Sequence, residues 1–367
     1  MVVLQVIDKY PTSYQNYLAK MLNKLALAIN IKLMIFDRTK KADHAIVAGS
    51  SRDYLFRLMY KVGLSKYNNE ALRLMYRYPI VHLQHSYLFP KVIPILNDKG
   101  INRPRIVITL RGGDTYLKPW IHERWYNFFK LYGNRVDAFI TMSENQKLYL
   151  QKWGVDNNRI HVIPISFGER SSSLPKYPNS EKIKIVSAFR MTWEKNILGN
   201  IILVKLLRDK GYKIEYDVFG DGADLSEVYY LTNKYSLADV INIKGRVDNE
   251  QLKEKLPEYD FFLQLSISEA LAASVIEAQS KGVPAIVSMS GGLPEAVLKD
   301  TSAIVEDYNS IVVIADKVID LWRNKELYFS YSKAAIQNAN DKFSIENELE
   351  RLVVLYKQII QVNGSRK

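Results

Sequence analysis

The chain has 367 residues, of which 47% are hydrophobic and 25% charged, and these values exclude extensive disorder and suit two globular domains. It contains no cysteine, which excludes disulfides, thiolate zinc sites and cysteine nucleophiles and fits the interior of a cell best. No apolar run reaches the length of a membrane span, and Met1 leads into a strand-like segment instead of a basic leader. We therefore expect a cytoplasmic protein that is neither exported nor integral to a membrane.

Positive charge is concentrated in the first half of the chain. Residues 1–170 hold 26 Lys and Arg against 12 Asp and Glu, a net charge of +14, whereas the remaining residues have a net charge of −2. Such a one-sided field attracts nucleic acid, an anionic bilayer or a phosphate-bearing substrate. The alternative is a set of scattered lysines that only aid solubility. No motif that reads RNA or DNA is visible, so no nucleic-acid partner is expected.

Short apolar strands alternate with helical segments along the chain, which predicts an α/β protein with parallel sheets covered by helices on both faces. Tyr14, Leu18, Leu22 and Leu25 recur at helical spacing, and Ser143 has the character of a helix N-cap. The pattern predicts a Rossmann-like domain over residues 1–170. Its expected strands are 2–7, 31–36, 79–84, 105–110, 136–141 and 160–165.

Residues 171–182 belong to a stretch rich in Ser, Pro and Gly without periodicity, and we interpret them as an interdomain linker. A second Rossmann-like domain is expected over residues 183–342. The final residues, 343–367, are expected to form a helix with one apolar stripe that must be buried. The expected strands of the second domain are 183–189, 213–219, 240–244, 261–266, 284–289 and 302–305.

Polar residues that follow apolar strands are the candidates for chemistry, because ligands bind beyond the carboxyl ends of parallel strands. After the strand at 261–266, Glu269 lies in the turn and Glu277 lies in a helix among apolar neighbours. A buried carboxylate needs donors, which sugar or ribose hydroxyls would supply. The small residues that follow Glu269 would let backbone amides approach a phosphate. The alternative for either glutamate alone is an ordinary solvated side chain.

Two cations, Arg190 and Lys195, follow the first strand of the second domain and flank a turn that contains Trp193. They could clamp a diphosphate through charge-assisted hydrogen bonds, or they could be surface cations. Glycine turns at Gly220-Asp221-Gly222 and at Gly291-Gly292 could also bring amides to a ligand, although each is weak evidence alone.

Taken in order, these motifs resemble the donor-binding half of glycosyltransferase family 4. The resemblance covers about the whole second domain and implies a retaining enzyme of GT-B architecture. That architecture has two Rossmann-like, doubly wound parallel-sheet domains facing across a cleft and a C-terminal helix that crosses back to the first domain. The motifs are Arg190…Lys195, Gly220-Asp221-Gly222, Gly245-Arg246-Val247, Ser266…Glu269…Glu277, Gly282-Val283-Pro284 and Gly291-Gly292-Leu293-Pro294-Glu295.

The resemblance also implies roles for single residues. Glu277 would bind the ribose hydroxyls, Glu269 would hold the donor sugar, and Arg190 and Lys195 would neutralise the departing diphosphate of a UDP- or GDP-sugar. No metal or other cofactor is implied, because these cations stabilise the leaving diphosphate. The resemblance also implies that the leaving phosphate takes the acceptor proton on the front face, so that no dedicated protein base is required. In the family, the nucleobase of the donor usually lies near the positions of Gly245, Arg246 and Val247. The remaining donor-site positions are Gly220, Ala270, Leu271, Ala272, Ala273 and Ser274.

The first domain resembles the family mainly in architecture. Asp114, after the strand at 105–110, is our candidate for a further catalytic residue, and the expected acceptor side is made of Arg111, Gly112, His85 and Tyr14. His82 and His85 could in principle bind metal, but no carboxylate cluster accompanies them, which favours packing.

The run 116–132 interleaves aromatic residues with cations. A helix lying on a bilayer would have this pattern. A core-facing helix with lysines on its solvent side would have it too, and the run alone favours this second interpretation. The charge of the domain supports the bilayer, and we expect salt-sensitive binding to an anionic membrane.

The sequence as a whole predicts transfer of a sugar from a nucleotide-sugar donor to a glycan or lipid-linked acceptor in cell-surface polysaccharide or glycolipid synthesis. The enzyme is expected at the cytoplasmic face of a membrane as a peripheral protein. The alternatives are a non-catalytic, transferase-like partner subunit, and an epimerase or phosphorylase of the same architecture. Intact Arg190, Lys195, Glu269 and Glu277 argue against the non-catalytic subunit.

Overall fold

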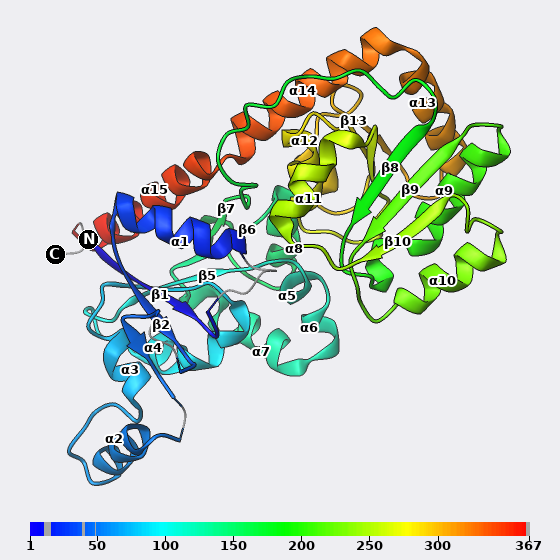
Figure 1. The fold of residues 1–367 in the computed structure, drawn as a ribbon. Helices are drawn as coiled ribbons and strands as arrows, with labels where there is room; N and C mark the ends of the chain where they lie inside the picture. The colour runs from blue at the N-terminus through cyan, green and yellow to red at the C-terminus, as the bar shows by residue number, and fades with distance from the viewer. Residues whose placement is uncertain (11–15, 39–40, 48, 365–367) are drawn as a thin grey trace. The chain divides into compact units, whose positions relative to one another are not determined.

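The computed structural model describes residues 1–10, 16–38, 41–47 and 49–364. The chain divides into two compact units: unit 1 is Met1–Pro164 with Glu348–Lys367, and unit 2 is Ile165–Asn347. Each unit contains one parallel sheet (Figure 1). Among the described residues, no helix is both long and apolar enough to cross a bilayer.

The sheet of unit 1 has seven strands in the order β3-β2-β1-β4-β5-β6-β7, and all pairs are parallel. The order turns back between β1 and β4, which makes the sheet doubly wound, with its switch point there. β3 is a two-residue edge strand that the sequence pattern did not indicate. The strands are β1 (Val2–Ile7), β2 (Asn30–Ile35), β3 (His44–Ala45), β4 (Ile80–Leu83), β5 (Arg105–Thr109), β6 (Ala138–Thr141) and β7 (Ile160–Val162).

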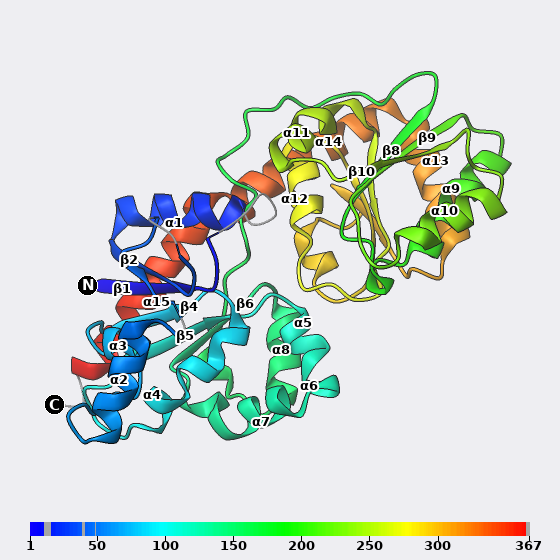
Figure 2. The same cartoon turned by 60° about the horizontal axis from the view of Figure 1, so that its bottom comes forward.

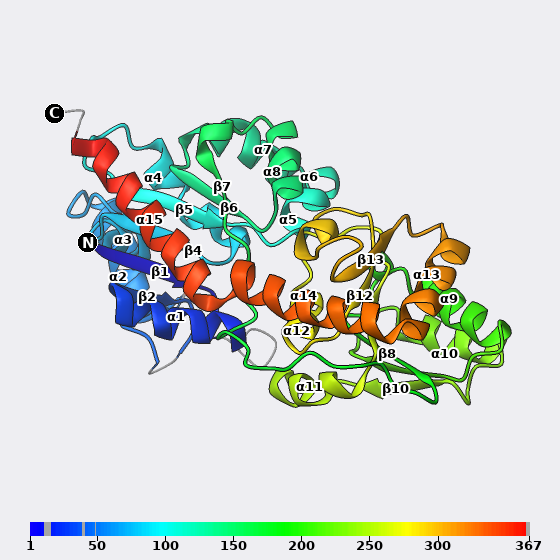
Figure 3. The ribbon, with the colours of Figure 1, turned by 90° about the horizontal axis from the view of Figure 1, so that it is seen from above.

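Helices cover both faces of this sheet. Figures 1 and 3 show α1 and α15 side by side on one face, with α3, α4 and α7 on the other. Leu4, Val6, Val81 and Leu83 point to the second face, where they join the aromatic core of unit 1. The helices are α1 (Asn16–Ala28), α2 (Ser51–Lys61), α3 (Glu70–Met75), α4 (Ile93–Asn97), α5 (Gly113–Tyr116), α6 (Lys118–Ile121), α7 (Glu123–Tyr132), α8 (Glu144–Lys152) and α15 (Ile345–Gly364).

The sheet of unit 2 has six parallel strands in the order β10-β9-β8-β11-β12-β13, with its switch point between β8 and β11. Figure 2 shows α9, α10 and α13 on one side of the sheet and α11, α12 and α14 on the other. The strands are β8 (Ile183–Ala188), β9 (Ile214–Phe219), β10 (Ile241–Gly245), β11 (Phe261–Gln264), β12 (Ala285–Ser288) and β13 (Ala303–Glu306). The helices are α9 (Ile197–Asp209), α10 (Leu225–Lys234), α11 (Asn249–Lys255), α12 (Ala273–Ser280), α13 (Ile311–Arg323) and α14 (Lys325–Phe343).

The doubly wound α/β fold expected from the sequence is confirmed, and each predicted strand is present within three residues at its ends. Ser143 caps α8 by accepting a hydrogen bond from the amide of Gln146. Residues 171–182 differ from the expected linker because they belong to unit 2 and are tied to it. The amide of Ser171 donates to Asn340 Oδ1 at 2.7 Å, and the amide of Asn179 donates to Asp260 Oδ1 at 2.7 Å.

The last helix belongs to unit 1 from Glu348 onward, although α14, which precedes it, belongs to unit 2. Its apolar stripe is buried as expected, with Leu352, Leu355 and Tyr356 in the core. Tyr356 is fully buried, and its hydroxyl accepts a hydrogen bond from Gln5 Nε2 of β1 at 3.1 Å. The terminal helix therefore completes the fold of the first unit.

Candidate functional site

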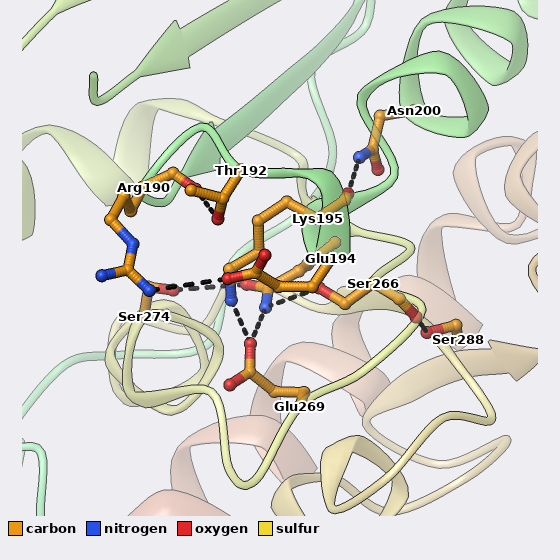
Figure 4. Close-up of polar contacts among 10 residues, drawn as sticks. Arg190, Thr192, Glu194, Lys195, Asn200, Ser266, Glu269, Ser274 and Ser288 are labelled. Atoms are coloured by element: carbon orange, nitrogen blue, oxygen red, sulfur yellow. Dashed lines mark hydrogen bonds and ion pairs between the residues drawn. The ribbon is translucent and has the colours of Figure 1, made fainter. Parts of the chain in front are cut away.

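The strongest candidate site lies at the switch point of unit 2, where the chain leaves β8 and β11 in different directions. Lys195 ends a short 3-10 helix, η5 (Trp193–Lys195), after β8, and Glu269 lies in the turn after β11. Their side chains form an ion pair (Figure 4). Because the two side chains are only 13% and 15% exposed, screening by water is reduced and the pair is stronger than one at the surface.

Glu269 is held from two sides. Gln264, buried at the end of β11, donates from Nε2 to Glu269 Oε2 at 2.9 Å. The amide of Gly292 donates to the backbone oxygen of Glu269 at 2.8 Å. Gly291, with φ 58°, packs so closely that a Cβ added there would lie 2.1 Å from that same oxygen. The glycine turn is therefore needed for the position of Glu269, and its expected amide contact with a ligand stays a prediction.

The loop that carries Lys195 is fixed to the neighbouring loop by Asn200 of α9. This side chain is buried, donates from Nδ2 to the Lys195 oxygen at 2.9 Å, and accepts from the amide of Leu265 at 3.0 Å. The amide of Ile267 also donates to the oxygen of Glu194 at 2.8 Å. The two loops of the switch point thus form one connected unit.

Arg190 lies on the same loop but is 74% exposed, and its guanidinium is 3.5 Å from Glu194 Oε1 (Figure 4). The structure therefore places both expected cations at this sheet edge, with Lys195 partly buried in an ion pair and Arg190 reaching into solvent. A partly exposed guanidinium can bind a phosphate without first breaking a buried pair.

Glu277 is buried in α12, and its bonds go to α11. Asn249 Nδ2 donates to Glu277 Oε1 at 2.9 Å, and Lys253 Nζ lies 3.6 Å from the same oxygen. Burial raises the pKa of Glu277, while Lys253 and Asn249 act in the opposite direction. Among the described residues, the side-chain partners of Glu277 are thus in α11, whereas Glu269 pairs with Lys195.

The remaining donor-side positions follow strands of the same sheet. The amide of Gly220 donates to the oxygen of Gly245 at 2.8 Å, and Gly220 has φ 125° in a place where a Cβ would lie 1.9 Å from the Phe189 oxygen. Arg246 is exposed, and its Nε donates to Asp221 Oδ2 at 2.8 Å. Val247 is half-buried. In the turn after Glu269 and at the start of α12, the buried residues are Ala270, Leu271 and Ala272, and the half-buried ones are Ala273 and Ser274.

In unit 1 the carboxylate of Asp114 accepts hydrogen bonds from its own loop and from Ser86. It accepts from the amides of Arg111 at 3.0 Å and Gly112 at 3.0 Å and from Ser86 Oγ at 2.5 Å. Gly112 has φ 117°, a conformation that favours glycine. Asp114 therefore orders the loop that begins α5, and its catalytic role stays a prediction.

The expected acceptor-side residues lie next to this loop. Arg111 donates from Nη2 to Gln84 Oε1 at 3.1 Å and lies over the ring of Tyr17, 5.2 Å from its centroid. His85 is buried and stacks on Tyr87, and burial, helped by the charge of Arg111, lowers the pKa of its imidazole to about 4. Tyr14 lies outside the described residues.

His82 belongs to a buried polar network, as the packing interpretation predicted. Its Nδ1 lies 2.6 Å from the Tyr356 hydroxyl and its Nε2 lies 2.7 Å from Thr109 Oγ1. Gln84 joins the network by donating to Gln5 Oε1 at 2.9 Å, and it extends the network to Arg111 by accepting from Nη2. Within the described ranges, no three His, Asp or Glu side chains gather as metal ligands would.

The aromatic run at 116–132 is mainly part of the core. Trp125, Phe128 and Phe129 of α7 are buried, which supports the core-facing interpretation for this helix. Trp120 and Ile121 of α6 are each 69% exposed.

Sequence reasoning missed Asn200, Gln264, Asn249 and Lys253. A signal existed for the first two, since each is a polar residue inside an otherwise apolar segment. Nothing in the spacing of Asn249 and Lys253 pointed to Glu277, because the pairing depends on how α11 packs against α12.

Comparison with known proteins agrees with this geometry. Residues 171–338 match the family model described as glycosyl transferases group 1, and residues 17–165 match the model described as glycosyltransferase family 4. A curated relative is the poly(ribitol-phosphate) alpha-N-acetylglucosaminyltransferase of Staphylococcus aureus (strain COL), 24% identical over 226 residues. That match covers 61% of this chain and 44% of the relative, so the chain matches less than half of the relative's length.

Two solved structures share the fold over nearly the whole chain. Sucrose-phosphate synthase from Thermosynechococcus elongatus has a TM-score of 0.74 at 16% identity and covers 98% of this chain and 99% of its own. HepE from Anabaena, solved in complex with UDP and glucose, has a TM-score of 0.73 at 13% identity and covers 98% of this chain and 100% of its own. At these identities the likeness concerns the fold.

Proposed function

Since this chain belongs to the group 1 glycosyl transferases, with a first unit of glycosyltransferase family 4 type, we propose that it transfers a sugar from a nucleoside-diphosphate sugar to a glycan or lipid-linked acceptor. The observation that carries the proposal is the partly buried Lys195–Glu269 ion pair at the switch point of unit 2. A cation and an acid at this sheet edge suit a ligand that has both a diphosphate and hydroxyl groups.

In this proposal the ammonium of Lys195 and the guanidinium of Arg190 bind the diphosphate, while Glu269 accepts hydrogen bonds from sugar hydroxyls. Glu277 binds the ribose, and the backbone at 245–247 borders the base. The donor exchanges one partner of Lys195 for another, because its phosphate competes with Glu269 for the ammonium. Support for a UDP-sugar comes from the neighbour HepE, which was solved with UDP and glucose.

The reaction breaks the bond between the anomeric carbon and the diphosphate oxygen and forms a bond from that carbon to the acceptor oxygen. In the retaining course that we propose, attack occurs on the face from which the diphosphate leaves, and the acceptor proton passes to the departing phosphate. Negative charge grows on that phosphate in the transition state, so fixed cations lower the barrier. Lys195 and Arg190 would supply them without a metal ion.

Unit 1 binds the acceptor in this account. Its net positive charge suits a phosphate-bearing acceptor, and the curated relative from Staphylococcus aureus is named for poly(ribitol-phosphate). Arg111 and His85 lie beside the loop that Asp114 orders, and they are our candidates for acceptor contact.

The test is a panel of UDP- and GDP-sugars incubated with the full chain, with release of the nucleoside diphosphate as the readout and an EDTA arm. We expect release from a UDP-sugar that EDTA leaves unchanged, and NMR of the product should show the anomeric configuration of the donor. Binding without release for every donor and acceptor would favour a non-catalytic partner subunit. An inverted product would refute the retaining course.

A further inference from the structure

Helix α2 (Ser51–Lys61) presents its apolar side to solvent. Of its eleven residues, all of them described, Asp53 and Phe56 are the buried ones. Tyr54 and Leu58 are 69% and 46% exposed, and Val62, the C-cap, is 59% exposed. At 3.6 residues per turn these three and Leu55 fall on one stripe about 100° wide, opposite Phe56. An amphipathic helix that packs only against its own domain would turn its apolar side toward the domain and its polar side toward solvent.

Cations lie along both edges of this stripe. Arg57 and Lys61 are on one edge and Arg52 is on the other. Residues 50–80 contain six Lys or Arg and two acids, Asp53 and Glu70, which are both buried. Arg57 pairs with Asp53 at 3.0 Å and Arg52 pairs with Glu70 at 3.3 Å, yet both arginine side chains stay exposed. The charge that meets solvent around the stripe is therefore positive.

A hollow of about 650 Å³ lies beside the same helix. Its lining includes the cations Arg57 and Lys61, the amides Asn68 and Asn69, and the ring of Tyr60. Cationic and amide donors around an open hollow suit the phosphate of a lipid headgroup.

We propose that α2 docks this protein on an anionic lipid bilayer. Its apolar stripe enters the interfacial layer, and the flanking cations contact lipid phosphates, as in helices that lie in the plane of a membrane. A second copy of the chain fits the same surface poorly, because a symmetric contact would place these cations against each other. The docking surface consists of Tyr54, Leu55, Leu58, Val62, Arg52, Arg57 and Lys61, together with Leu64, which follows the helix and is 75% exposed.

This surface does not depend on the donor chemistry, so the two can be tested apart. Transfer to a water-soluble acceptor reports the proposed function, and binding to vesicles reports the docking surface. The membrane contact that we expected from the run at 116–132 is here assigned to a different helix.

The experiment is co-sedimentation of the full chain with phosphatidylglycerol–phosphatidylcholine vesicles and with phosphatidylcholine vesicles alone. We expect binding to the anionic vesicles that falls as salt is added. The double variant Leu55→Ser/Leu58→Ser should lower vesicle binding at least tenfold, since it removes two side chains that would be buried in the interface. Lys61→Gln should lower it about fivefold, the effect of one cation near an anionic surface.

The matched control is Trp120→Ser/Ile121→Ser on α6, which alters two apolar side chains that are even more exposed, at 69% each, and should leave vesicle binding unchanged. All of these side chains are largely solvent-exposed, so circular dichroism and nucleotide binding should stay those of the wild type. A Tyr54→Trp variant adds a direct signal, with a blue shift of its emission expected on anionic vesicles. The proposal is overturned if the α6 variant loses binding and the α2 variant keeps it. Equal binding to both vesicle types, or a dimer that the α2 variant abolishes without any change in vesicle binding, would also overturn it.

Discussion

The hydroxyl of Tyr356 in α15 lies 2.6 Å from Nδ1 of His82 in β4, although 274 residues separate the two. The last helix of the chain is thus bonded directly to the centre of the first sheet. Through Gln84, the same buried network reaches Arg111 at the expected acceptor side. Tyr356 is therefore a candidate positioning residue for the acceptor, acting through other side chains.

Replacing Tyr356 with Phe should destabilise unit 1 by about 1–3 kcal/mol, because it removes the buried hydroxyl that bonds Gln5 Nε2 and His82 Nδ1. We expect the KM for the acceptor to rise while the KM for the donor stays unchanged. Steady-state kinetics with each substrate varied in turn will measure this. Tyr328→Phe is the matched control, since it removes a buried hydroxyl that donates to the Asp260 oxygen in unit 2 at 2.6 Å. An equal change in acceptor KM for both variants would show that Tyr356 acts only through stability.

Unit 1 should lose stability as the pH falls below about 6.5. Burial, together with the charge of Arg111, lowers the pKa of His82 from 6.5 to about 3 and that of His85 from 6.5 to about 4. The unfolded chain then takes up protons that the folded chain does not, so stability is complete above the unfolded pKa and falls as the pH drops toward the folded values. Each imidazole contributes up to about 1.4 kcal/mol per pH unit to the slope of the free energy of unfolding against pH.

Hydrogen exchange at the amides of β4 and β5 between pH 5 and pH 7 will test this, with correction for the intrinsic exchange rate. The substitution His85→Gln should reduce the slope, because it removes one of the contributing imidazoles. A slope that the variant does not change would show that His85 is neutral for another reason or is protonated in the folded state.

The substitution Gly291→Ala should displace Glu269 and lower donor turnover. Gly291 has φ 58°, and an added Cβ would lie 2.1 Å from the Glu269 oxygen, so the chain must move. We expect a loss of about 1–3 kcal/mol in stability and a larger relative loss in turnover. The control is Gly211→Ala, which has φ 90° but nothing within 4 Å, and which therefore reports backbone strain alone. Equal effects of the two variants on turnover would show that the contact with Glu269 is unimportant.

The sequence predicted the sheets well because parallel strands buried on both faces are nearly continuous apolar runs. β3 was not predicted because His44 and Ala45 form a two-residue edge strand that contains no apolar run. The stretch 171–182 was interpreted as a linker from its composition, but composition does not reveal hydrogen bonds such as the one from the Lys176 amide to Ser332 Oγ at 3.0 Å.

The sequence indicated where the candidate site lies, but it did not indicate which hydrogen-bond and ion-pair partners the residues there take. Residues after strand ends must lie at one sheet edge, so Lys195 and Glu269 could be placed there from the sequence. Which partner each one takes depends on side-chain packing over long separations, and for this reason Asn249, Lys253 and Asn200 were not foreseen. Asp114 also follows a strand, but its carboxylate accepts hydrogen bonds from the amides of its own loop, a local contact that its position in the sequence did not indicate.

The central claim is that Lys195 grips the diphosphate of a sugar donor at the edge of the second sheet, and titration calorimetry with UDP tests it most directly. The substitution Lys195→Met should weaken UDP binding about tenfold to a hundredfold, the value of a charge-assisted contact of about 1.5–3 kcal/mol. The control Lys205→Met removes an ion pair to Asp209 on α9 of the same unit and should bind as the wild type does. Unchanged UDP affinity in a correctly folded Lys195→Met protein would contradict the account.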